Sequence, residues 1–159
     1  MTTVVCSWVN YTKEKTILNS TVTRHIPGKK PETLKYSEDM INESLNDPQV
    51  IYLGLPAKES APKTAQLQAV ILGLKHLKES DKNIILLTSQ DAKNLIQSES
   101  ERLLKTERGD LTYIIHGILN NVPNRTYRIY KADYSTIKKF LSNNKLPKQI
   151  QHQPQGHAK

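Results

Sequence analysis

The stretch "TAQLQAVILGLKHLKESDKNIILLTS", residues 64–89, constrains the fold more than any other part of the sequence. Five apolar residues recur in it at helical spacing: Leu67, Val70, Ile71, Leu74 and Leu77. This stripe predicts an amphipathic helix that packs on a sheet. The run "NIILLTS" that follows is short and continuously apolar, which is typical of a strand covered on both faces. Together they predict an α/β domain with this strand at the centre of its sheet.

The first third of the chain predicts a hairpin and an insertion. "TTVVCSWVNY" and "KTILNSTVTRHI" alternate or are rich in β-branched residues, so we expect two strands joined near "TKEK". Residues 27–48 are polar, and we interpret them as an insertion with a loop and a short helix N-capped by Ser37. "QVIYLGLP" predicts the third strand, and "AKESAPK" a connecting loop.

The second half predicts three further helices and one strand. A helix should start at Gln90 in "QDAKNLIQSESERLLKTERG", and another, capped by Asp110, should follow in "LTYIIHGILNNV". "NRTYRIYKA" returns to strand alternation, and "DYSTIKKFLSNNK" predicts a last helix. Residues 147–159 lack a core-forming pattern and are expected to be a basic, disordered tail. The prediction is one domain over residues 1–146.

The charge balance favours an anionic partner. Lys and Arg number 23 against 15 Asp and Glu, a formal net charge of +8. A surplus of this size suggests nucleic acid, although a solvated lysine-rich surface is the alternative. Residues 136–159 carry five lysines and no acid. The lysines expected to contact phosphates are Lys131, Lys138, Lys139, Lys145 and Lys148.

The sequence gives weaker indications of the cellular compartment and of the roles of single reactive or aromatic residues. No apolar run approaches the ~20 residues that span a bilayer, and the first residues lack a secretory layout. We therefore expect an intracellular protein without a membrane partner, in the cytoplasm, the nucleus or a virus-like particle. Cys6 cannot form an internal disulfide and is expected to be a packed strand residue. His116 is expected to be exposed, and Trp8 with Tyr11 to offer either base stacking or ordinary strand packing.

Two sequence segments, "TAQLQAVILGL" and "IILLTSQDAKNLI", resemble the glutamate helix and the following strand end of the ribonuclease H-like superfamily. The resemblance covers about residues 2–144. It implies the element order βββαβααβα, with a mixed five-stranded sheet and helices on both faces. Active members of the superfamily cleave the RNA strand of RNA/DNA hybrids with two divalent ions, which clustered carboxylates hold.

The chain departs from the superfamily at those carboxylates. The first-strand aspartate falls at about Ser7, the helix glutamate on Gln66 and the next aspartate on Ser89, all neutral residues. The fourth position falls on Asp133, which we interpret as an N-cap. A site that has lost three negative charges should hold no metal cofactor and perform no hydrolysis.

The resemblance therefore implies a catalytically inactive domain, similar to the tether or connection domains of retroelement and viral reverse transcriptases. Such a domain contacts RNA or an RNA/DNA duplex, or binds a protein such as a polymerase subunit. Two alternatives stay open. The chain is a free-standing interaction module with the same fold, or it is an active, Mg²⁺-dependent ribonuclease H with an unusual site.

Overall fold

The computed structural model describes residues 1–12, 15–41, 57–97 and 109–151. Five strands lie in these ranges: β1 (Thr2–Tyr11), β2 (Lys15–His25), β3 (Glu32–Ile41), β4 (Asn83–Thr88) and β5 (Thr126–Lys131). The helices in the same ranges are α1 (Ala57–Leu74), α2 (Gln90–Ile96), α3 (Gly109–Asn120), α4 (Tyr134–Asn143) and α5 (Lys148–Gln151).

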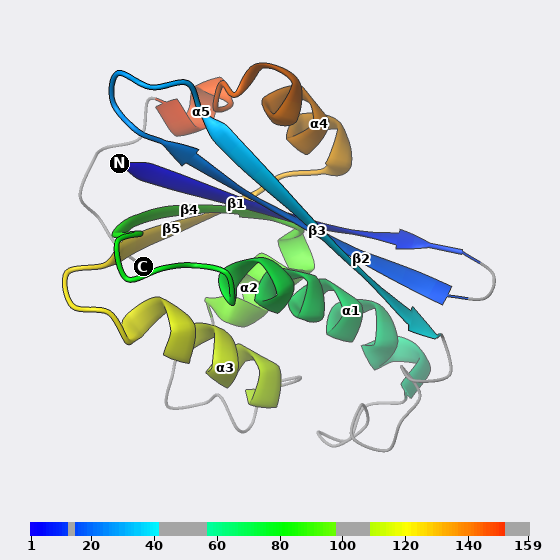
Figure 1. Cartoon of the computed structure of the whole chain (residues 1–159). Coiled ribbons are helices and arrows are strands. Elements are labelled where there is room, and N and C mark those ends of the chain that lie inside the picture. Colours follow the sequence, from blue (N-terminus) through cyan, green and yellow to red (C-terminus); the bar gives the residue numbers. More distant parts are fainter. Residues whose placement is uncertain (13–14, 42–56, 98–108, 152–159) are drawn as a thin grey trace.

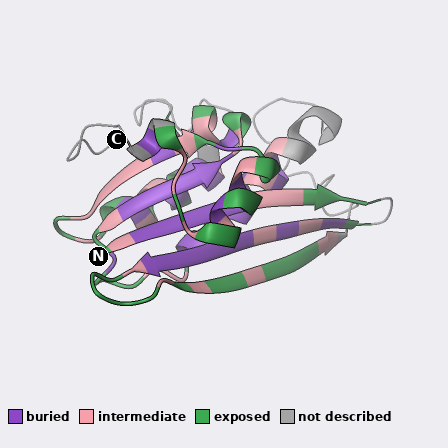
Figure 2. Ribbon diagram, turned by 90° about the horizontal axis from the view of Figure 1, so that it is seen from above, coloured by how far each residue is buried: buried purple, intermediate pink, exposed green. Residues whose placement is uncertain are grey.

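The strands form one mixed sheet in the order β3-β2-β1-β4-β5. Strands β1, β2 and β3 pair antiparallel, whereas β4 pairs parallel with both β1 and β5. The sheet is buried along β1 and β4 and largely exposed along its edge strand β3 (Figure 2). The α/β class and the five-stranded mixed sheet are confirmed. Strand β4 is an interior strand between β1 and β5, as the apolar run predicts, but the middle strand of the sheet is β1.

Helices cover both faces of this sheet, as expected. Helices α1, α2 and α3 lie on one face, and α4 and α5 lie on the other (Figure 1). Alternate residues of β1 and β4 point to the two faces, so Val5 and Leu86 pack under α1 while Val4 and Leu87 pack under α4. The central strands therefore need apolar residues at every position, which explains the continuous run in "NIILLT".

The third strand is not where the sequence suggested. Residues 27–48 were expected to be an insertion with a helix capped by Ser37, but β3 lies within that range and Ser37 pairs with Asn19 of β2. An edge strand with one solvent-facing side tolerates polar residues, and only Tyr36 and Met40 of this strand pack against the cluster beneath α1. The segment "QVIYLGLP", residues 49–56, lies outside the described residues.

Three helix boundaries also differ. Helix α1 begins at Ala57, so "AKESAPK" is helical and not a loop. Asp110 lies in the first turn of α3, which begins one residue earlier. The expected tail contains α5, whose Ile150 is only 2% exposed and packs with Phe140. Residues 98–108 of the predicted second helix and 152–159 of the tail lie outside the described residues. None of the described helices combines the length and apolarity that crossing a bilayer requires.

A buried carboxylate ties together the end of the sheet at which β1 and β4 begin and β2 ends. Asp81, which is 0% exposed and precedes β4, accepts hydrogen bonds from Thr3 Oγ1 (2.6 Å) and the Lys78 backbone N–H (2.7 Å). Arg24 of β2 donates to both of its carboxylate oxygens, at 2.9 and 2.8 Å. Burial alone would raise the pKa of Asp81, but the bonds from Arg24, Lys78 and Thr3 outweigh it and lower the pKa to about 2.

A second arginine extends this network to α3 and β5. Arg125 donates to three backbone carbonyl groups: Asp81 (2.7 Å), Ile118 (2.9 Å) and Lys78 (2.7 Å). These bonds satisfy carbonyl groups of the turn before β4 and of α3. The two arginines therefore fix one end of the sheet and leave the other end free of this constraint.

Helix α1 packs closely against the sheet at Gly73. A Cβ atom at this position would lie 2.0 Å from Ser20 Oγ and 2.8 Å from Val5 Cγ1. Ser20 cannot turn away without cost, because its hydroxyl donates to the Cys6 carbonyl at 2.9 Å. Glycine at 73 thus permits the contact between α1 and the β1–β2 pair.

Replacing Asp81 with asparagine should lower the free energy of unfolding by about 3–5 kcal/mol, because Arg24 would keep its buried charge without a counterion. Urea unfolding measures this directly. Asp39→Asn is the control: its bond to Lys15 is about half exposed, so the loss should stay below about 1 kcal/mol. Equal losses in the two variants would contradict the role of Asp81.

The stabilising contribution of Asp81 should also depend on pH. Since the folded pKa of Asp81 lies below its unfolded value of 3.8, this contribution is present above pH 4 and disappears as the pH falls through about 2.

Gly73→Ala should destabilise the domain by about 1–3 kcal/mol, because the added methyl group collides with Ser20 and Val5. Gly117→Ala in α3 is the matched control, since nothing lies within 4 Å of a Cβ atom there. That change should stabilise the protein by up to about 1 kcal/mol through helix propensity. Thermal unfolding of both variants provides the comparison, and a stabilised Gly73 variant would rule out the close approach.

Candidate nucleic-acid interface

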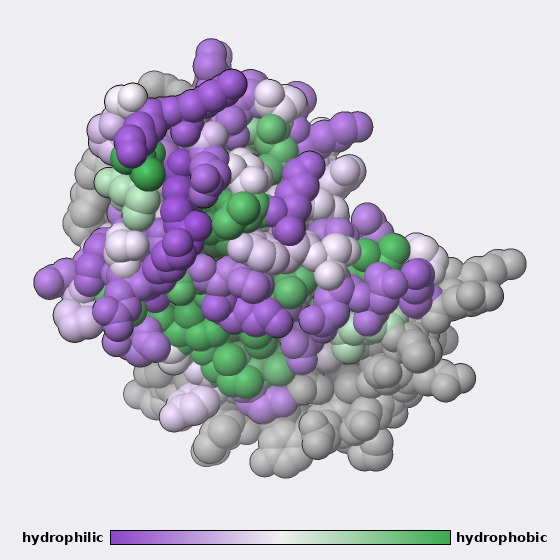
Figure 3. Space-filling view, viewed as in Figure 1, coloured by the Kyte–Doolittle hydropathy of each residue, from purple (hydrophilic) through white to green (hydrophobic). Residues whose placement is uncertain are grey.

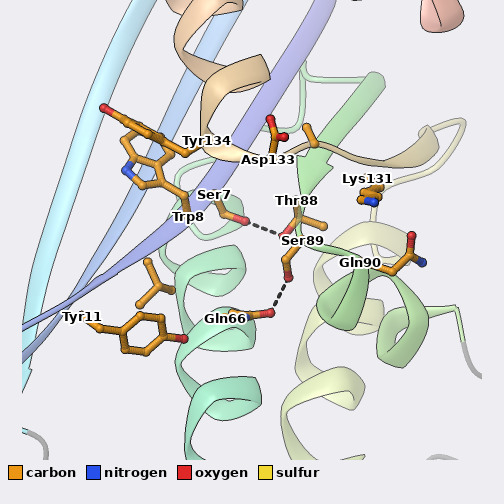
Figure 4. A pocket seen from close by; sticks show the side chains of 12 residues that line it. Ser7, Trp8, Tyr11, Gln66, Thr88, Ser89, Gln90, Lys131, Asp133 and Tyr134 are labelled. Carbon is orange, nitrogen blue, oxygen red and sulfur yellow. Dashed lines mark hydrogen bonds between the residues drawn. The ribbon is translucent and has the colours of Figure 1, made fainter.

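The four positions singled out by the resemblance converge on one pocket. Ser7 lies on β1, Gln66 on α1, Ser89 directly after β4 and Asp133 two residues after β5. Because β1, β4 and β5 run parallel, their carboxyl ends meet at one edge of the sheet, where α/β proteins commonly bind ligands. The pocket there has a volume of about 250 Å³ (Figure 4).

Neutral side chains occupy the floor of the pocket and bond to one another. The hydroxyl groups of Ser7 and Thr88 share a hydrogen bond of 2.8 Å. Ser89 donates to the amide oxygen of Gln66 and, as the N-cap of α2, accepts from the Ala92 N–H at 3.2 Å. These bonds pair the hydroxyl groups of the floor with neutral partners (Figure 4).

Tyr11 extends this chain toward solvent. Its phenol group points at Gln66 and bonds to that side chain (Figure 4). Burial nevertheless raises the pKa of Tyr11, with a smaller contribution from the negative charge of Asp91. The phenol is therefore neutral at ordinary pH, like the rest of the floor.

Asp133 is the carboxylate of the pocket lining, and it acts as a helix cap. Its Oδ1 accepts the Thr136 N–H at 2.9 Å, so the predicted N-cap of the last helix is confirmed. The backbone bond from Thr136 comes first among the causes that lower the pKa of Asp133, and the charges of Lys131 and Lys139 add to it. Asp133 is thus ionised, exposed and close to two lysines.

This set of donors does not fit two divalent ions. Mg²⁺ and similar hard cations need several anionic oxygen ligands, and a two-metal site needs enough of them to offset the repulsion between the ions. Of the four positions only Asp133 is charged, and it already serves α4. Among the residues that the structure describes, no three His, Cys, Asp or Glu side chains form a group that could hold a metal.

Aromatic rings form one wall of the pocket. The rings of Trp8 and Tyr134 contact each other with centroids 5.5 Å apart and planes tilted by 37°. Tyr134 is 50% exposed and Tyr11 is 54% exposed, so both present ring surface to solvent beside the half-buried Trp8. Tyr134 and Gln90 were not anticipated as site residues. Their position next to Asp133 and Ser89 is the signal that would have found them.

The five predicted lysines lie along one path that starts at the pocket. Lys131 lines the pocket itself. Lys138 and Lys139 line an adjoining hollow with Tyr134, and Lys139 also lines the next one, with Lys145 and Lys148. All five are exposed, and no acid occurs from residue 134 to 151. The structure therefore places these five lysines along one path, although they were predicted from the charge pattern of the sequence alone.

Two other reactive residues are accounted for by packing. Cys6 is fully buried, and burial raises the pKa of its thiol to about 12, which agrees with the expected strand residue. His116 was expected to be exposed, but it is half-buried and its Nε2 atom bonds to the Ile96 carbonyl at the end of α2. His116 lies off the apolar stripe of α3, and its ring makes a polar contact between α3 and α2.

No protein-family model matches this sequence, and no curated protein matches it significantly.

Introducing carboxylates into the pocket should create a metal site. In a Gln66→Glu/Ser89→Asp variant, two new acids would join Asp133, and we expect saturable Mn²⁺ binding by calorimetry and a melting temperature that rises with Mn²⁺. The unchanged protein should give neither signal at the same ion concentrations. A Ser80→Asp/Gln97→Glu variant adds the same charge at exposed positions and is the control. Equal Mn²⁺ binding by the unchanged protein would contradict this reading of the site.

Proposed function

We propose that the chain is a catalytically inactive ribonuclease H-like domain that holds nucleic acid, RNA or an RNA/DNA duplex, on the surface formed by α4, α5 and the end of β5. The observation that carries the proposal is the path of five exposed lysines leading away from a pocket without metal ligands. A polymerase or nuclease acting on the same strand is the expected partner, as in a retroelement or viral replication complex.

The sheet supports the ribonuclease H-like part of the proposal. Three antiparallel strands followed by two parallel ones, in the order β3-β2-β1-β4-β5, agree with the fold that the resemblance implies. The positions of Ser7, Gln66, Ser89 and Asp133 in one pocket agree with it too, because residues far apart in the sequence meet where the resemblance expects a common site. Neither agreement depends on charge or composition.

The hydrogen bonds of the floor support the inactive part. Gln66 and Ser89 bond to each other, and Ser7 bonds to Thr88. The neutral side chains at the three positions where the superfamily has carboxylates are therefore all hydrogen-bonded. Polar groups that are paired in this way stabilise a buried floor at little cost. A floor of this kind can support a bound strand without cleaving it.

The charges of the path support nucleic acid over a neutral partner. Each lysine that neutralises a phosphate releases condensed counterions, which makes the affinity fall with the salt concentration. Asp133 is the acid beside this path, and Lys131 and Lys139 offset its charge. The path therefore presents a net positive surface to a phosphate backbone.

Reversing two charges on α4 should separate this surface from general basicity. For a Lys138→Glu/Lys139→Glu variant, we expect the affinity for a labelled RNA/DNA hybrid to fall at least about tenfold and the salt dependence to become shallower. Filter binding across a salt series measures both quantities. Lys75→Glu/Lys78→Glu makes the same charge change beyond the end of α1, on the opposite side of the sheet, and should have a much smaller effect.

Three outcomes would overturn the proposal. Equal losses in the two lysine variants would mean that only net charge matters. Cleavage of the hybrid by the unchanged protein with Mg²⁺ would show that the site is active. Salt-insensitive or absent binding would favour a protein-interaction module.

A further inference from the structure

The pocket has the lining of a binding site for a neutral, flat group. Its volume of about 250 Å³ is smaller than the ~300–1,000 Å³ of typical small-molecule pockets, which suits one ring system better than a larger ligand. Trp8, Val9, Tyr11 and Tyr134 supply apolar or aromatic surface on one side. We propose that this pocket receives a single unpaired base of a single-stranded segment, an inference that rests on the proposed function.

The polar groups of the pocket suit the edge of a base. The Gln66 amide keeps at least one N–H donor beyond its bonds to Ser89 and Tyr11, and the Gln90 amide, which donates to Asn94 Oδ1 at 2.6 Å, lies at the rim (Figure 4). Amides and hydroxyl groups can donate to and accept from a nucleobase without bringing a charge into the pocket. Carboxylates at positions 66 and 89 would instead leave an anionic site without a counterion.

The aromatic rings supply the stacking surface. Tyr134 and Tyr11 are each about half exposed at the mouth, and Trp8 lies against Tyr134. Bases stack on such rings with little sequence preference, and only an unpaired base offers a free face to them. A base inside a duplex is already stacked and paired, so entry requires a single strand, a bulge or an end.

The phosphates that flank this base would lie outside the pocket. Lys131 stands at the rim, and Lys138 and Lys139 lie just beyond Tyr134 along α4. Asp133 at the mouth disfavours a phosphate inside the pocket itself. The space-filling view shows that hydrophilic side chains predominate on the part of the surface toward α4, which favours a hydrated backbone over an apolar partner there (Figure 3).

Trp8 reports on this pocket directly, since the chain contains a single tryptophan. We expect a short single-stranded RNA to quench its fluorescence saturably at constant salt. The same number of phosphates in a blunt RNA/DNA hybrid should bind in a filter assay without this quenching. A strand of abasic sugar phosphates keeps the charge, lacks the base and should not quench either.

Tyr134→Ala tests the stacking wall while it keeps the reporter. We expect single-strand affinity to fall about tenfold and hybrid affinity to stay within twofold of the unchanged protein. Tyr113→Ala is the matched control, because Tyr113 is 67% exposed on α3, on the other face of the sheet. Equal urea midpoints for the two variants establish that both remain folded.

The outcomes separate this inference from the proposed function. If hybrid and single strand both bind through Lys138 and Lys139 but Trp8 is never quenched, the base pocket is wrong and the proposed function stands. Quenching by the abasic strand equal to that by RNA would also overturn the pocket. If no nucleic acid binds at low salt, both proposals fail.

Discussion

The buried Asp81 carboxylate joins segments that lie far apart in the sequence, and the arrangement of the sheet depends on it. Thr3, Arg24 and Lys78 all donate to this one side chain, so β1, β2 and the turn before β4 share a common anchor. Arg125 then binds the backbone of the same turn and connects α3. A buried charge with several hydrogen bonds fixes geometry, because no other partner could replace them without leaving a charge unpaired.

This anchor lies at the end of the sheet opposite the pocket. At the amino-terminal ends of the parallel strands a buried carboxylate is paired with several donors, whereas at their carboxyl ends the floor of the pocket consists of neutral side chains. The network that positions β1 and β4 also positions Ser7 and Ser89 across from Gln66. The charged anchor and the neutral pocket thus lie at opposite ends of the same strands.

Burial explains which parts of the fold were predictable. The apolar stripe of α1 packs on one face of the sheet and the apolar run of β4 is covered on both faces. Both were predicted from the sequence, although Leu77 of the predicted stripe lies beyond the end of α1. Strand β3 was missed because an edge strand places few side chains in the core and can carry exposed acids such as Glu38 and Asp39. The neutral positions of the pocket followed from the resemblance. Their hydrogen bonds did not, because Ser7 and Thr88 are 81 residues apart and no local pattern links them.

The central claim is that the pocket at the carboxyl ends of β1, β4 and β5 binds nucleic acid and not metal ions. A heteronuclear NMR titration tests it most directly, with the Trp8 indole N–H and the Gln66 side-chain amide as probes. We expect both signals to shift saturably with single-stranded RNA in the presence of a chelator, and neither to shift with Mg²⁺ alone. Saturable shifts around Ser89 and Asp133 with Mg²⁺ alone, and none with RNA, would contradict the claim.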